Sequence, residues 1–185
     1  MREEYKDYLV QLYQCIPHYI FETLAIVLII GMALVLLLWG LSKGWRKICV
    51  LLLIEYIVLI YCSTVVFRRT IENLPVKLIP FDRYANVLNG TSGHIEPELL
   101  MNVLVFIPVG LLIIKAFKEI KWWKILFAGI SLSLSVETLQ FCFSKGTVEI
   151  DDVIHNVAGC MIGYGIYKGA RYIVDRVKRE ILFRV

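Results

Sequence analysis

The chain has 185 residues, of which 58% are hydrophobic and 19% are charged. A soluble domain carries about 25% charged residues, and the apolar residues here are gathered in long runs, so a soluble enzyme and a disordered chain are both excluded. The 20 Lys and Arg residues against 16 Asp and Glu residues leave a net charge of only +4, which argues against nucleic-acid binding. The five cysteines form no metal-binding spacing and are interpreted as small apolar packing residues.

The first third of the chain predicts a surface helix followed by two membrane spans. In residues 1–19, aromatic and aliphatic side chains recur at helical spacing among charged ones, which is typical of a helix at the membrane interface. Residues 20–67 contain two long apolar runs, 20–41 and 48–67. Since a bilayer core about 30 Å thick needs about 20 apolar residues in a helix, each run predicts a transmembrane helix. Glu55 interrupts the second run, and the sequence suggests no partner for it.

The rest of the chain divides into a core, residues 68–170, and a basic cytoplasmic tail, residues 171–185. The core holds further apolar runs at residues 99–117, 123–143 and 150–168. The last run is the weakest because His155 and Asn156 lie within it. Together the runs predict an all-α fold, a polytopic membrane bundle of about five transmembrane helices.

The basic residues orient the predicted spans, because Lys and Arg are enriched in the cytoplasmic loops of membrane proteins. With five spans, one side of the membrane receives Lys43, Arg46, Lys47, Lys115, Lys118, Lys121, Lys124, Lys168, Arg171, Arg176, Lys178, Arg179 and Arg184. The other side receives the smaller set of Arg2, Lys6, Arg68, Arg69, Lys77, Arg83 and Lys145. The bias therefore predicts that the N-terminus is outside and the C-terminus is in the cytoplasm.

Polar side chains recur on single faces of the last three predicted spans. An ionisable side chain at the centre of a span costs about 2.5 kcal/mol or more, so its presence there indicates a function or a partner. In the predicted orientation, one set lies in the outer half of the membrane: Asn102, Glu137, Gln140, Asp151, Asp152 and Asn156. Arg68 reaches the same level from the end of the second span, and Gly159 and Gly163 would allow close helix packing beside it. These residues predict a polar binding pocket in the outer leaflet.

Three interpretations of these side chains stay open. In the first, the pocket binds or acts on a component of the outer membrane surface, with Glu137 and Asp152 as candidate catalytic acid–base groups. In the second, the carboxylates and Arg68 form an ionic network that only fixes helix register. In the third they line a conducting path, for which Glu55 alone supplies a polar group in the inner half. A metal site is a weaker alternative, since His155 is the one imidazole near the carboxylates, and we expect neither a metal nor a cofactor.

Four short motifs, in this order, resemble the VanZ-like family of small bacterial membrane proteins. The motifs are Arg68-Arg69 with Asn73-Leu74-Pro75 and Ile79-Pro80-Phe81, then Asn102 with Phe106-Ile107-Pro108-Val109-Gly110, then Ser135-Val136-Glu137 with Gln140, and finally Gly146 with Ile150-Asp151-Asp152 and Asn156-Val157-Ala158-Gly159. Two positions depart from the family pattern. Thr147 stands where the family usually has an Arg, and Glu149 stands where it usually has an Asp.

The resemblance implies a multi-pass protein of the bacterial cytoplasmic membrane that is associated with reduced susceptibility to the glycopeptide teicoplanin. The implied partners are the lipid bilayer and either a lipid-linked envelope precursor or the glycopeptide itself. An enzyme acting on a lipid-linked or peptidoglycan-related substrate is the alternative. Pro75 and Pro80 favour an extended or turning segment, which we expect to fold over the outer mouth with Phe81 as an apolar plug.

Overall fold

The computed structural model describes residues 31, 44–81, 84–85, 88–89, 97–117 and 120–182. The predicted surface helix and all of the first predicted span except Gly31 lie outside these residues. The described helices are α3 (Trp45–Tyr61), the π-helical turn η1 (Cys62–Val66), α5 (Pro97–Ala116), α6 (Trp122–Cys142) and α7 (Ile150–Leu182). Two short strands, β1 (Val76–Lys77) and β2 (Val148–Glu149), complete the set. The fold is thus mostly helical, as the sequence predicts.

Three helices in the described part of the chain are long and apolar enough to cross a membrane. They are Trp45–Val66, Leu99–Ala116 and Trp122–Cys142, and they coincide with the second, third and fourth predicted spans. The fifth predicted span lies in α7, which does not belong to this set because its first half carries polar side chains such as His155 and Asn156. A membrane protein is therefore supported, while the count of five spans stays a prediction.

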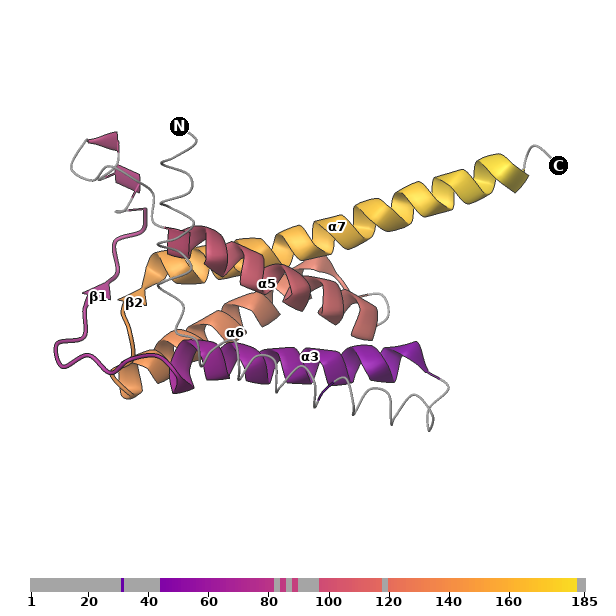
Figure 1. Ribbon diagram of the computed structural model, residues 1–185. Coiled ribbons are helices and arrows are strands. Elements are labelled where there is room, and N and C mark those ends of the chain that lie inside the picture. Colours follow the sequence, from indigo (N-terminus) through magenta and orange to yellow (C-terminus); the bar gives the residue numbers. More distant parts are fainter. Residues whose placement is uncertain are drawn as a thin grey trace, which may run out of the picture.

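Glycines set the spacing between α5 and α7, which lie side by side in Figure 1. A Cβ atom built on Gly159 would lie 2.2 Å from the Val103 carbonyl oxygen, and one on Gly163 would lie 2.2 Å from the Ile107 carbonyl oxygen. No side chain fits at such distances, so glycine is required where the backbones approach. The close packing predicted for Gly159 and Gly163 is confirmed.

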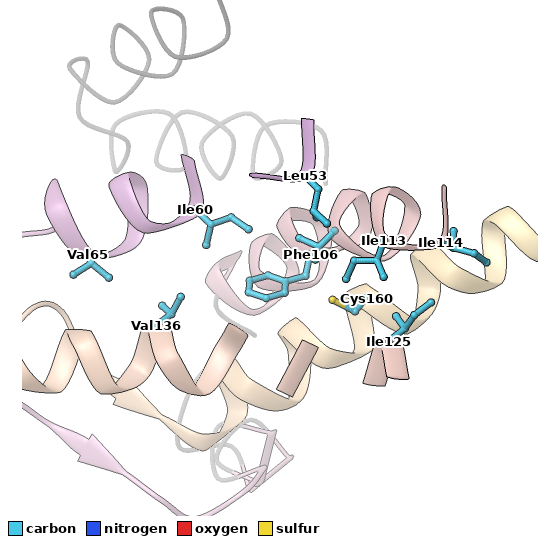
Figure 2. Packing of buried hydrophobic residues seen from close by; sticks show 10 residues of the cluster. Leu53, Ile60, Val65, Phe106, Ile113, Ile114, Ile125, Val136 and Cys160 are labelled. Atoms are coloured by element: carbon cyan, nitrogen blue, oxygen red, sulfur yellow. The ribbon is translucent and has the colours of Figure 1, made fainter. Parts of the chain in front are cut away.

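The apolar core lies where α3, α5, α6 and α7 meet. Figure 2 shows Leu53 and Ile60 of α3 above Phe106 of α5, with Cys160 of α7 beside them. Phe106, Ile60 and Cys160 are almost fully buried. Cys160 is one of the described free cysteines, and it packs as the small apolar side chain that the sequence predicts.

Glu55, the acidic residue without a predicted partner, lies against Gly31. A Cβ atom built on Gly31 would lie 1.6 Å from Oε1 of Glu55, so the carboxylate occupies the space that glycine leaves open. Gly31 is therefore the described residue whose missing side chain makes room for this carboxylate.

A segment outside the helices, the strap (residues 68–81), pairs with the residues that join α6 to α7. β1 and β2 are parallel, with Val76 opposite Val148 and Lys77 opposite Glu149, and Figure 1 shows them side by side at one end of the bundle. The all-α prediction contains no such sheet. It was missed because two-residue strands paired across about seventy positions leave no periodic signal in the sequence.

Candidate functional site

Buried polar side chains from α6 and α7 face each other between these two helices. We call six residues the polar cluster: Ser133, Glu137 and Gln140 of α6, Glu149 of β2, and Asp152 and Asn156 of α7. All six are at least nine-tenths buried. Steps of three or four positions put each helix's members on one face, as the sequence predicts.

The two faces are joined by hydrogen bonds at two levels. The Asn156 side chain donates from Nδ2 to Oγ of Ser133 at 2.9 Å. One turn along α6, the backbone N–H of Glu149 donates to Oε2 of Glu137 at 3.1 Å. Because β2 leads directly into α7, the second bond fixes the start of α7 against the face of α6 that carries Glu137.

Gln140 connects the polar cluster to the end of α3. Its Nε2 donates to the Thr64 carbonyl oxygen at 2.9 Å, and Thr64 lies in the π-helical turn η1. The last carbonyls of a helix have no partner within it, so the Gln140 amide satisfies one of them. The buried Gln140 side chain is therefore fixed in orientation.

Glu137 is the electrostatic centre of the polar cluster. Its carboxylate is repelled by the negative charges of Asp152 and Glu149 and attracted by the positive charge of Arg68. Arg68 is half-buried and lies across Gly146, where a Cβ atom would be 2.1 Å from Nε of Arg68. Gly146 has a φ of +68°, which glycine adopts without strain. Glycine at position 146 therefore allows the backbone turn after α6 and also leaves space for the Arg68 guanidinium beside Glu137.

Glu149 is a member of the polar cluster that sequence analysis noted only as a departure from the family pattern. Its carboxylate is 2% exposed and forms an ion pair with Nζ of Lys77, at 3.2 Å from Oε1. Lys77 reaches it from β1 of the strap. No helical spacing links Glu149 to Glu137 or Asp152, so only the fold reveals that these residues belong together.

Asp151 holds the strap rather than facing Glu137. Its Oδ1 accepts a hydrogen bond from the backbone N–H of Phe81 at 2.7 Å, and its carbonyl oxygen is bonded to Nδ1 of His155. The predicted apolar plug is wrong, because the Phe81 ring is 53% exposed. Its backbone, with a φ of +63°, makes the contact in place of the ring.

His155 and Asn102 also lie apart from the polar cluster's hydrogen bonds. Both ring nitrogens of His155 are occupied, since Nε2 bonds the Tyr84 hydroxyl at 2.6 Å. Across the described residues, no three His, Cys, Asp or Glu side chains converge as metal ligands. Asn102 is half-buried on α5, and within the same residues no hydrogen bond joins it to the polar cluster.

The sequence profile of the VanZ/LLP1 family matches residues 25–174, which include the strap and the whole polar cluster. The chain belongs to this family. It is also similar to Protein VanZ of Enterococcus faecium, with 41% identity over 70 residues, or 38% of this chain and 44% of that protein. The chain thus aligns with less than half of the length of that VanZ protein. No solved structure matches.

Family membership confirms the resemblance drawn from the four motifs. Thr147 follows Gly146 at the position where the family pattern has an Arg, yet Arg68 places its guanidinium directly against that glycine. A basic group therefore lies beside Gly146, and Arg68, from the start of the strap, supplies it.

Proposed function

We propose that this protein is a multi-pass protein of the bacterial cytoplasmic membrane whose polar cluster binds a cell-envelope component and thereby reduces susceptibility to teicoplanin. In this proposal the chain spans the membrane five times, the N-terminus is outside, and the polar cluster opens toward the outer leaflet. The binding residues in this proposal are Arg68, Gln140 and Asn156 around the two central carboxylates, Glu137 and Asp152, together with Asn102 of α5 and Asp151 at the start of α7. The lipid bilayer and a lipid-linked precursor, or the glycopeptide itself, are the partners.

The burial of three carboxylates in one place carries the proposal. Glu137, Glu149 and Asp152 are each at least nine-tenths buried between helices of a membrane protein. Removing a charge from water costs several kcal/mol per ion, and stability alone is served better by apolar packing there. The presence of three carboxylates at such a costly position supports a role for them in binding a ligand.

A catalytic version is the second candidate, and Glu137 is the observation that favours it. Its Oε2 accepts a hydrogen bond from the Glu149 backbone N–H, and the negative charge of Asp152 repels the same carboxylate. Two neighbouring carboxylates can divide acid and base roles when they transfer protons to a bound substrate. The substrate would be a lipid-linked or peptidoglycan-related molecule.

The test is teicoplanin susceptibility of cells that express the wild type, Asp152→Asn, or the control Asp175→Asn. Asp175 is exposed on the same helix and pairs with Arg171 at its surface, so its loss should not affect the polar cluster. We expect protection by the wild type and by the control, and its loss in Asp152→Asn at equal membrane abundance. Protection by Asp152→Asn equal to that of the wild type would contradict the proposal.

The pattern over several variants separates the two candidates from a purely structural network. Catalysis predicts that Asp152→Asn or Glu137→Gln alone abolishes protection, whereas binding predicts graded losses across Asn102, Gln140 and Asn156. A structural network predicts that the same variants mainly lower the amount of protein in the membrane, because an orphaned buried charge destabilises the fold.

A further inference from the structure

The second part of α7 leaves the bundle and exposes apolar and charged side chains together. We call residues 168–181 the distal half. In Figure 1 it extends beyond the ends of α3, α5 and α6 toward the C-terminus, and each of its residues is exposed. Seven of its 14 residues are charged, so it does not belong in the hydrocarbon core of a membrane. The apolar side chains within it therefore need another explanation.

The apolar side chains of the distal half form one stripe along the helix. They recur at helical spacing, which places them on one side of α7. The stripe consists of Ala170, Ile173, Val174, Val177 and Ile181. The four larger side chains are 48% to 62% exposed. A continuous apolar face that the bundle leaves exposed indicates a surface that binds something else.

Basic side chains flank this stripe. Five basic residues and two acidic ones give the distal half a net charge of +3. The acidic residues are Asp175 and Glu180, and each pairs with an arginine of the same helix. Arg171 and Lys178 each follow directly after a member of the stripe, so positive charge borders it along one edge. An apolar stripe with a basic edge is complementary to the surface of a membrane that contains anionic lipids.

Two glycines lie where α7 leaves the other helices. Gly159 and Gly163 are required by packing against α5, but no atom beyond the local helix backbone lies within 4 Å of a Cβ atom built on Gly165 or Gly169. Glycine weakens a helix because it loses more conformational freedom than any other residue. α7 therefore bends most easily at residues 165–169, and such a bend allows the distal half to lie along a membrane surface.

We propose that the distal half of α7 binds the anionic surface of the membrane, with the apolar stripe in the head-group region and the flanking basic side chains at the lipid phosphates. The inference concerns a surface separate from the polar cluster and goes beyond the proposed function. The positive-inside bias predicts that this half is in the cytoplasm, and the cytoplasmic leaflet carries a negative surface potential. A second copy of the chain fits the stripe less well, because pairing would bring together two segments of the same positive charge.

The experiment uses the full-length protein in bilayer discs, in a variant whose own cysteines are replaced by serine or alanine. Val177→Cys carries an environment-sensitive fluorophore in the stripe. Tyr172→Cys carries it at a matched exposed position, about 140° away around the helix. The discs contain either phosphatidylcholine alone or phosphatidylcholine mixed with phosphatidylglycerol.

We expect blue-shifted emission from position 177 in the anionic discs, a smaller shift in the phosphatidylcholine discs, and little difference at position 172. Salt at 1 M should reverse the shift, because it reduces the Debye length to about 3 Å.

A pair of variants with the same loss of charge tests the basic edge. Each basic side chain near an anionic surface strengthens binding about fivefold. Replacing both Arg171 and Lys178 by Gln should therefore lower the ratio of bound to free distal half about 25-fold. Replacing both Lys121 and Lys124 by Gln removes two exposed charges at the start of α6, and this control should retain the shift.

Equal emission from position 177 in the two kinds of disc, or equal emission from positions 177 and 172, would overturn the inference. A shift that appears only when a disc holds two copies would also overturn it, because a second copy would then cover the stripe. The first comparison uses one labelled protein in two lipid mixtures, so it stands even where a charge variant does not fold. Either result leaves the proposed function to be decided by Asp152→Asn.

Discussion

Single residues determine whether the strap can pack against the helices, and Gly146 is the clearest example. We expect Gly146→Ala to lower the melting temperature of the purified protein, because a Cβ atom would be strained at a φ of +68° and would displace Arg68. The left-handed conformation alone costs a non-glycine residue about 1–2 kcal/mol. Gly165→Ala is the control, since no atom beyond the local backbone of its own helix lies within 4 Å of its added Cβ. Equal melting temperatures for the two variants would contradict this account of Gly146.

The ion pair between Lys77 and Glu149 gives a second prediction at this scale. Lys77→Ala removes one ion-pair partner of the Glu149 carboxylate, which is 2% exposed. We expect a loss of stability of about 1–2 kcal/mol, because a buried charge is destabilised when an opposite charge beside it is removed. The Arg176–Glu180 pair is exposed at both ends, so Arg176→Ala should cost less than about 0.5 kcal/mol. Unfolding in denaturant, monitored by tryptophan fluorescence, compares the two losses. Restoration of stability by the added change Glu149→Gln would identify the buried Glu149 charge as the cause, and a larger loss in Arg176→Ala would refute this explanation.

The sequence predicts those residues of the polar cluster that helical spacing connects. Glu137 with Gln140, and Asp152 with Asn156, share faces because α6 and α7 are regular helices. Glu149 cannot be found this way, since it joins Glu137 through a backbone bond made by β2. Asp151 has helical spacing and burial similar to those of Asp152, yet its carboxylate bonds Phe81. Spacing reveals which residues share a face, but the partner of each depends on the path of the strap.

Among the elements, the crossing of α5 and α7 depends on glycine more than on apolar area. We expect Gly159→Leu to prevent the native packing, because the Val103 carbonyl oxygen leaves no room for even one carbon. Gly169→Leu should change the melting temperature little, because Gly169 lies on the exposed part of α7 and no atom beyond its local helix backbone is within 4 Å of its added Cβ. The readouts are melting temperature and the fraction of monodisperse protein after extraction. If Gly159→Leu is extracted and melts like the wild type, α5 and α7 do not pack as described.

The elements differ in how far the sequence predicts them. Three apolar runs predict the helices Trp45–Val66, Leu99–Ala116 and Trp122–Cys142, because length and hydropathy decide such helices locally. α7 is harder, since its polar first half faces the other helices while its second half is exposed and charged. β1 and β2 could not be predicted at all. They exist because the turn at Gly146 brings residues 148–149 to the strap, and that turn is a property of the assembled bundle.

At the scale of the whole molecule, orientation decides what the polar cluster can meet. The strap and β2 lie at the end of the bundle where α7 begins, and α7 runs from there to the C-terminus at the far end (Figure 1). The basic residues concentrate on the far side, including Arg171, Arg176, Lys178 and Arg179 of the exposed half of α7. The positive-inside rule then predicts that the strap lies outside the cell.

This orientation is tested with single cysteines in a variant whose own cysteines are replaced by serine or alanine. Asn73→Cys lies in the exposed part of the strap, and Lys178→Cys lies in the exposed half of α7. We expect a membrane-impermeant maleimide to label position 73 on intact cells and position 178 only after lysis. The reverse pattern would place the polar cluster toward the cytoplasm. The molecule within its reach would then be a lipid-linked precursor during its assembly, and not a component of the outer surface.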